Sequence, residues 1–166
     1  MTNVTKVPVP EQSLLSPTLA TASFYDAYQV KNMKPDRSPL QIWLDVVSQP
    51  APWVEGAMNI RNKVVSLFGL KTGDVAGMRN TKKLAADYKV GDRIGIFLIF
   101  NLSENELVMG EDDKHLDVRL SLYKSADSKY ATISTIVHIN NFLGRVYMFF
   151  VTPPHRIIAK YMTAKI

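Results

Sequence analysis

Cysteine is absent from this sequence, and its absence removes several classes of chemistry. None of the 166 residues is a cysteine, so disulfides, thiolate metal ligands and a cysteine nucleophile are excluded. Long apolar runs are missing too. No stretch reaches the roughly 20 apolar residues of a membrane-spanning helix, and residues 1–15 lack the apolar core of a signal peptide. We therefore expect a soluble protein, and the lack of cysteine fits a cytoplasmic location.

Concentrated positive charge is also lacking. The net charge is +5, but the 20 Lys and Arg residues are spread from Lys6 to Lys165, and only Arg79, Lys82 and Lys83 cluster. Nucleic-acid-binding proteins gather their cations on one face, because neutralising phosphates supplies much of the affinity. Scattered cations instead predict a mildly basic, solvated surface and no nucleic-acid partner.

What is present is the composition of one globular domain. Hydrophobic residues make up 46% and charged residues 21% of the chain, and a chain of this length can bury a sizeable core without disulfides or metals. Residues 1–20 contain Pro8, Pro10 and Pro17 and few large side chains, which indicates an extended N-terminal arm. Residues 21–166 are expected to form a single domain.

The first half of this domain predicts a strand followed by two helices. Residues 23–31 partly alternate apolar with polar side chains, as a strand does. Ser38 and Pro39 suit the start of a helix. The first helix then carries an apolar stripe of Leu40, Trp43, Leu44 and Val47. The second begins at the Pro50–Pro52 break, and its stripe is Trp53, Ala57, Ile60, Val64 and Phe68 before a stop at Gly69.

The second half predicts an antiparallel meander and a C-terminal helical region. Residues 71–91 show no clear period, and we expect them to contain a short strand, because long structureless loops are unusual in a domain. Strands are predicted over residues 93–102, 106–111, 116–123 and 130–139. Asn140 or Asn141 is expected to cap a helix over residues 142–151, and Pro153–Pro154 to break it before a last helix over residues 155–164.

The order strand, two helices, strands, helix predicts an α+β fold and resembles the helix-grip architecture of START-like lipid-transfer domains, birch-allergen-like proteins and polyketide cyclases. Four phrases carry a closer resemblance, from about Phe24 to the C-terminus: WVEGAMNIRNKVVSLFG, GDRIGIFLIF, GEDDKHLDVR and NFLGRVYMFFVTPPHRII. They are similar to a bacterial family known as domain of unknown function 2867. The resemblance implies a curved antiparallel sheet wrapped on a C-terminal helix and a tendency to enclose apolar ligands, with no established activity. Five strands are visible in the pattern, against seven in a full helix-grip domain, so residues 71–91 supply the others or the sheet is smaller.

The aromatic and methionine content is open to two interpretations. In a closed fold these side chains fill the core. In a helix-grip fold they can also line a pocket, because ligand sites are mostly apolar with a few polar anchors. The candidate ligand-binding residues are Trp53, Arg61, Phe97, Tyr123 and Tyr147.

One cluster of polar residues is a candidate for chemistry. Glu111, His115, Asp117 and Arg119 lie within nine positions of each other, and carboxylates beside an imidazole can share a proton. The structural alternative is a hairpin turn with Asp117 and Arg119 paired on one strand face. The spacing matches no metal-binding loop, and no dinucleotide, phosphate or nucleophile motif is present, so neither metal nor cofactor is expected.

Three functions follow from these patterns. The leading hypothesis is a non-catalytic binder of a small apolar or amphipathic ligand in a pocket between the sheet and the C-terminal helix. The first alternative is a cyclase or isomerase that uses Glu111, His115, Asp117 and Arg119. The second is a membrane-surface or protein-interaction module, homodimer included, built on residues 142–151, whose large side chains from Tyr147 to Val151 are consecutive and cannot all face one core.

Overall fold

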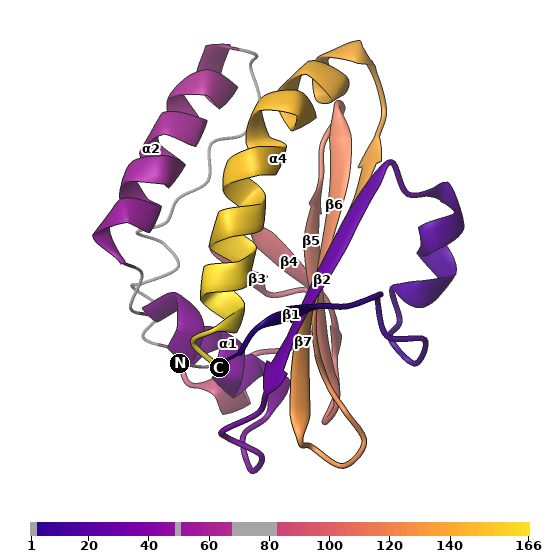
Figure 1. Cartoon of the computed structure of the whole chain (residues 1–166), viewed down its shortest axis with the longest axis vertical. Coiled ribbons are helices and arrows are strands. Elements are labelled where there is room, and N and C mark those ends of the chain that lie inside the picture. Colours follow the sequence, from indigo (N-terminus) through magenta and orange to yellow (C-terminus); the bar gives the residue numbers. More distant parts are fainter. Residues whose placement is uncertain (1–2, 49–50, 68–82) are drawn as a thin grey trace.

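The protein combines one antiparallel sheet with helices in a computed structural model that describes residues 3–48, 51–67 and 83–166 (Figure 1). The strands are β1 (Thr5–Lys6), β2 (Phe24–Lys31), β3 (Arg93–Ile94), β4 (Phe97–Leu102), β5 (Glu106–Asp112), β6 (Leu116–Lys124) and β7 (Tyr130–Ile139). The α-helices of the described residues are α1 (Pro39–Ser48), α2 (Pro52–Leu67) and α4 (Phe142–Thr163), and the 3₁₀ helices are η1 (Ser16–Thr21) and η2 (Ala85–Asp87). The expected end of the second helix at Gly69 lies outside the described residues. Of residues 71–91, in which a short strand was expected, residues 71–82 lie outside the described part, and residues 83–91 contain η2 and no strand.

The sheet has the order β1-β2-β7-β6-β5-β4-β3, with antiparallel neighbours throughout. The predicted α+β class is confirmed, since a curved antiparallel sheet carries the C-terminal helix on one face, as in a helix-grip arrangement (Figure 1). The described part of the sheet has seven strands. The two that the sequence pattern did not reveal come from the N-terminal segment, which contributes β1, and from the division of residues 93–102 into β3 and β4.

Residues 93–102 were expected to form one strand, and that prediction is wrong. β3 ends at Ile94 and β4 begins at Phe97, and the two strands pair with each other. Gly95 lies between them with φ of 60°, a left-handed conformation that glycine adopts without steric cost. The sequence pattern did not reveal this turn, because residues 94–102 are uncharged and mostly apolar, as in a continuous strand. Most of these side chains are partly or fully buried in the structure despite the turn.

The two faces of the sheet are covered by different parts of the chain. α1 inserts Leu40, Ile42 and Trp43 into the main core, which contains Leu107 and Leu122 of the sheet. The start of the chain covers the opposite face, where Val9 and Leu15 pack with Ala27, Val108 and Ile136. Figure 1 shows η1 on the side of the sheet away from α2 and α4.

Local sequence signals place both described N-caps where they were expected. Ser38 Oγ accepts a hydrogen bond from Gln41 N at 3.2 Å, while Gln41 Oε1 accepts one from Ser38 N at 2.9 Å, which is a capping box. At α4 the cap is Asn141, whose Oδ1 accepts from Gly144 N at 3.1 Å.

The prediction that Pro153 and Pro154 break the last helix is also wrong. α4 continues through both prolines as one helix of 22 residues. The missing donors would have served the carbonyls of Phe149 and Phe150, whose side chains are exposed, so water can reach this side of the helix. Thr152 also donates its hydroxyl to Met148 O at 2.6 Å. The prolines therefore lie inside a helix that they do not end.

Candidate functional site

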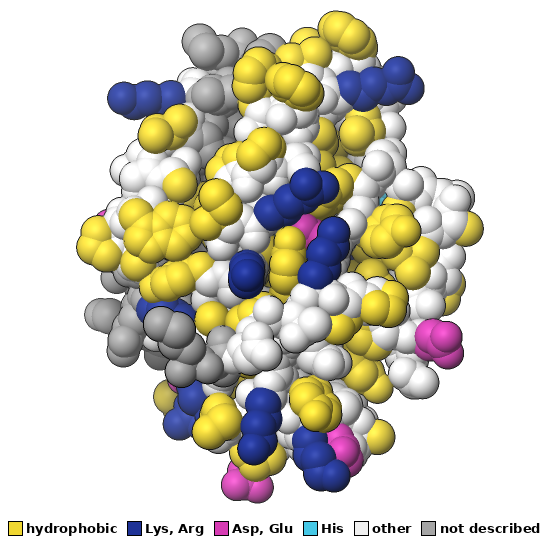
Figure 2. All heavy atoms as spheres, in the orientation of Figure 1, with side chains coloured by type: hydrophobic (Ala, Val, Ile, Leu, Met, Phe, Trp, Pro, Cys, Tyr) yellow, Lys and Arg dark blue, Asp and Glu magenta, His cyan; other side chains and the backbone are white. Residues whose placement is uncertain are grey.

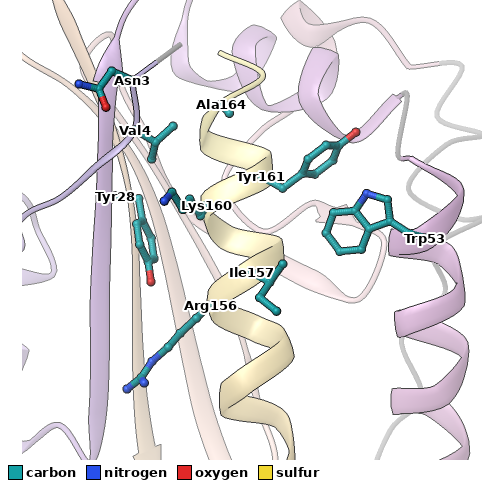
Figure 3. A pocket seen from close by; sticks show the side chains of 9 residues that line it. All are labelled: Asn3, Val4, Tyr28, Trp53, Arg156, Ile157, Lys160, Tyr161 and Ala164. Carbon is teal, nitrogen blue, oxygen red and sulfur yellow. The ribbon is translucent and has the colours of Figure 1, made fainter. Parts of the chain in front are cut away.

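The candidate site is an open depression of about 870 Å³ over the C-terminal half of α4. Figure 3 shows that its lining side chains lie on both flanks of this helix. The residues come from the start of the chain, β2, α2 and α4: Asn3, Val4, Tyr28, Trp53, Arg156, Ile157, Lys160, Tyr161 and Ala164. Four elements distant in sequence thus form one surface hollow.

One flank of the depression is cationic. Arg156 and Lys160 are four residues apart on α4, so they project from the same side of the helix, and Figure 3 shows both beside Tyr28 and Val4. Among the described residues, neither forms a salt bridge with a carboxylate. Two exposed cations beside apolar side chains are suited to hold an anionic group.

Tyr28 is buried against this cationic flank. Burial raises the pKa of Tyr28 above its ordinary value, and the nearby Asp26 carboxylate raises it further, while the positive charge of Arg156 acts in the opposite direction. The Tyr28 hydroxyl is therefore neutral at physiological pH and available as a hydrogen-bond donor to a ligand on this flank.

The other flank is aromatic and faces α2. The rings of Trp53 and Tyr161 meet edge to face with centroids 5.0 Å apart, a favourable geometry for an aromatic pair. Lys165 Nζ lies 5.1 Å from the Tyr161 ring centroid. Trp53 keeps 45% of its surface exposed, which leaves an indole face free for an apolar part of a ligand.

A buried polar pair, close in sequence to the lining residues Tyr28 and Arg156, joins the sheet to α4. Asp26 on β2 is 3% exposed, and its Oδ1 lies 3.2 Å from His155 Nε2. Its Oδ2 has no hydrogen-bond partner among the described residues, and neither has the hydroxyl of Thr135, which stands opposite Asp26 on β7. A buried carboxylate of this kind fixes the position of the helix turn that carries Arg156.

The predicted ligand-binding residues are not brought together. Trp53 lines the depression. Phe97 packs against the main core, and Tyr147 is buried in a third cluster under α4. Tyr123 pairs with Glu106 and Thr132 on the face covered by the N-terminal segment, and the Arg61 side chain lies outside the described residues.

The space between the sheet and the first half of α4 is packed with side chains. Leu116 and Val137 of the sheet contact Tyr147 and Met148 of the helix. Closer to the C-terminus, one flank of the depression opens between β1–β2 and α4 (Figure 3). The hollow that the structure offers is thus a surface site on this helix.

The predicted polar cluster is divided between different environments. Asp117 and Arg119 lie on one face of β6, while Glu111 stands opposite Val118 and so belongs to the other face. Glu111 forms a salt bridge of 2.7 Å with Arg93. His115 is buried at the hairpin end of β6.

Each of these side chains is held by a neighbour of its own. Arg119 binds Asp112 through both terminal nitrogens, at 2.5 and 3.1 Å, and its guanidinium lies 4.1 Å from the Phe100 ring centroid. Asp117 Oδ2 accepts from Asn140 at 3.3 Å. His115 Nδ1 lies 3.0 Å from the Asn141 cap. Among the described residues, no group of three His, Asp or Glu side chains could hold a metal ion.

Two lining residues, Arg156 and Lys160, could have been found from the distribution of charge along the sequence, which the overall composition does not show. Residues 142–166 contain no Asp or Glu, and Arg156 and Lys160 are separated by one helical turn. This local excess of positive charge did not stand out in the sequence, because Lys and Arg residues are scattered along the whole chain. Tyr28 and Val4 could not be found, because only the tertiary structure places the sheet edge beside α4.

Comparison with known proteins identifies a family and no function. Neither the curated proteins nor the solved structures include a significant match to the chain. The model of a protein family described as protein of unknown function (DUF2867) matches residues 18–162. This match covers most of the sequence and nearly every element described above, so the chain belongs to the DUF2867 family.

Proposed function

We propose that the protein binds a small amphipathic molecule with an anionic group in the depression over α4. The observation that carries the proposal is the pairing of two cations, Arg156 and Lys160, which form no salt bridge with a carboxylate of the described residues, with an apolar and aromatic lining. The anionic group would contact the cations and the Tyr28 hydroxyl. The apolar part would lie across the helix against Ile157 and Trp53.

The general architecture supports the same class of ligand. A curved sheet with a helix on one face is the arrangement of START-like domains, which the sequence resembles, and we propose membership of that superfamily together with the ligand class. Glu111 faces the side of the sheet opposite to Asp117 and Arg119, and His115 lies in the turn before β6 beside Asn141. Nothing in this placement favours a cyclase or isomerase reaction.

A first experiment asks whether the purified protein carries a ligand. Native mass spectrometry followed by denaturation and organic extraction would reveal a small mass that is released when the chain unfolds. The expected result is a reproducible anionic compound with an apolar part.

A second experiment uses a defined pair of probes, decanoate and decanol. The chain has two tryptophans, of which Trp43 is buried in the core, so the Trp43→Phe variant leaves Trp53 as the sole indole reporter in the depression. Decanoate should change the Trp53 fluorescence and saturate. Decanol lacks the anionic group and should bind more weakly.

The cationic flank can be tested by neutral substitutions. In the Arg156→Gln/Lys160→Gln variant, decanoate affinity should fall about tenfold, because hydrogen bonds to charged groups contribute roughly 1.5–3 kcal/mol and an exposed site lies at the low end. The control variant Lys89→Gln/Lys129→Gln removes two cations that do not line the depression. Equal losses in both variants, or equal binding of decanoate and decanol, would refute the proposed site.

A further inference from the structure

The outer face of α4 presents large apolar side chains to solvent. The exposed fractions are 74% for Phe142, 76% for Phe149, 57% for Phe150 and 62% for Ile157. Helix residues seven positions apart share a face, and Phe142–Phe149 and Phe150–Ile157 are two such pairs. The rings of Phe149 and Phe150 also contact each other, with centroids 5.3 Å apart. The exposed residues thus form one continuous apolar stripe opposite the core face of the helix.

Basic side chains accompany this stripe. Arg145, Arg156 and Lys160 are all exposed. Arg145 precedes Arg156 by about three helical turns, and Lys160 follows by one more, so the three cations lie along one flank. No Asp or Glu occurs in residues 142–166. Figure 2 shows Lys and Arg side chains grouped near the centre of this face among apolar ones, with a small part of an acidic side chain visible between them.

From these observations we propose that the outer face of α4 docks on an anionic lipid surface. A helix with an apolar face and Lys or Arg beside it lies in the plane of the membrane interface, with its rings among the acyl chains and its cations at the headgroups. α4 would bind in this way without crossing the bilayer. Among the described helices, none has the length and hydrophobicity that crossing requires.

Charge complementarity favours lipid over a second copy of the chain. A symmetric dimer through this face would place the same surface patch on both sides. Each α4 would then bring Arg145, Arg156 and Lys160 toward the same set on its partner, with no carboxylate in either helix to neutralise them. An anionic membrane supplies both the negative charge and the apolar phase.

The proposal goes beyond the small-molecule site and is separable from it. Phe142, Phe149, Phe150 and Arg145 do not line the depression. The two surfaces are nevertheless continuous along α4, since Ile157 belongs to both. A protein docked in this orientation would present its ligand site to the lipid phase.

The test is co-sedimentation with vesicles of phosphatidylcholine alone and of phosphatidylcholine mixed with phosphatidylserine. The wild-type protein should bind the mixed vesicles, and rising salt should weaken the binding. Phe149→Ser/Phe150→Ser and Arg145→Glu should each lower the bound fraction about tenfold at limiting lipid. The control Leu84→Ser/Val90→Ser changes two side chains of comparable exposure, 70% and 60%, outside α4 and should bind as wild type does.

Circular dichroism of each variant checks that the fold is kept, and the decanoate titration separates the two proposals. The Phe149→Ser/Phe150→Ser variant should lose vesicle binding and retain decanoate binding. Failure of the wild type to bind mixed vesicles would overturn lipid docking, whatever the decanoate result. A dimer in light scattering that this variant converts to a monomer, without vesicle binding, would assign the face to a second copy instead.

Discussion

The effect of replacing a glycine by alanine depends on the atoms that surround it in the folded protein, as Gly144 and Gly56 show. Gly144 is buried at the start of α4, where an added Cβ would meet the backbone carbonyl of His115 and approach Ile139 Cγ2 at 3.1 Å. Gly56 is exposed on α2, and an added Cβ there would meet nothing within 4 Å. A change from glycine to alanine should therefore lower the free energy of unfolding at position 144 and raise it at position 56.

Gly144→Ala should destabilise the protein by about 1–3 kcal/mol, because the backbone of the hairpin end would have to move to admit the methyl group. Gly56→Ala should stabilise it by about 0.5–1 kcal/mol, through the higher helix propensity of alanine. Urea denaturation of both variants measures the two free energies of unfolding. A neutral Gly144→Ala would show that α4 does not approach the hairpin so closely.

Tyr28 reports the electrostatics of the cationic flank. Its pKa is raised by burial and by Asp26 and is lowered by Arg156, so Arg156→Gln should raise the pKa further. At pH values between the unfolded and the folded pKa, Tyr28 is protonated in the folded protein and ionised in the unfolded chain. Stability contributed by this group is therefore complete below the unfolded pKa and is lost as the pH rises toward the folded pKa.

NMR titration of the Tyr28 ring carbon Cζ between neutral and strongly alkaline pH measures this shift directly. Tyr28→Phe assigns the resonance, and Lys89→Gln serves as a remote charge control. A Tyr28 pKa that is unchanged in Arg156→Gln would mean that the guanidinium does not act on the hydroxyl, and the proposed anion site would lose one of its three contacts.

At the scale of elements, a buried carboxylate contributes to holding the N-terminal segment on the sheet, beside the β1–β2 pairing and the apolar contacts of Val9 and Leu15. Glu106 on β5 is 3% exposed and accepts hydrogen bonds from the Ser13 hydroxyl at 2.6 Å, Leu14 N at 2.9 Å and the Ser121 hydroxyl at 2.5 Å. Ser13 and Ser121 are also buried. Loss of the carboxylate would leave their hydroxyls without an acceptor.

Glu106→Ala should cost roughly 2–4 kcal/mol, since each buried polar group left unsatisfied costs about 1–3 kcal/mol. The amides of Leu14 and Leu15 should then exchange with solvent faster than those of β6. Hydrogen exchange followed by NMR measures both regions in one sample. Glu104→Ala, in the exposed turn two residues earlier, should change neither, and slow exchange at Leu14 in Glu106→Ala would contradict this role.

Element boundaries differ in how far local sequence decides them. The Ser38 and Asn141 side chains bond to backbone groups within the first turn of their own helices. The start of α1 was therefore predicted correctly, and the N-cap of α4 was predicted as one of two residues, Asn140 or Asn141. The continuity of α4 was not predictable, because the two prolines lie next to exposed residues and a helix tolerates missing donors where water can reach the carbonyls. The apolar stripe of α2 was predicted from local sequence, and the tertiary structure leaves two of its members, Trp53 and Ile60, exposed.

At the scale of the whole molecule, both ends of the described chain join the main core. Ile166 is 3% exposed within that core, and Val4 packs against it. The first described residues and the C-terminal segment lie side by side, since Asn3, Val4 and Ala164 line the same depression (Figure 1). The core is therefore complete only when segments separated by the whole sequence have met.

Ile166→Ala should destabilise the protein by about 2–4 kcal/mol, the usual cost of emptying a buried aliphatic position. The matched control is Ile157→Ala, because Ile157 is 62% exposed and its truncation should cost less than about 0.5 kcal/mol. Thermal unfolding of the two variants compares them. Equal melting temperatures would show that the C-terminal residue is not part of the core.

The sequence by itself determined the α+β class, the antiparallel meander, the helix starts and the family. Alternation, stripes and caps are local patterns that act over a few residues, so they can be recognised without coordinates. The tertiary structure decided the rest. It set Glu111 apart from Asp117 and Arg119, because the register of β5 against β6 places Glu111 opposite Val118, whose side chain points to the other face of the sheet. It also brought Tyr28, Trp53, Arg156 and Lys160 to one hollow, because long-range packing alone brings β2 and α2 beside α4.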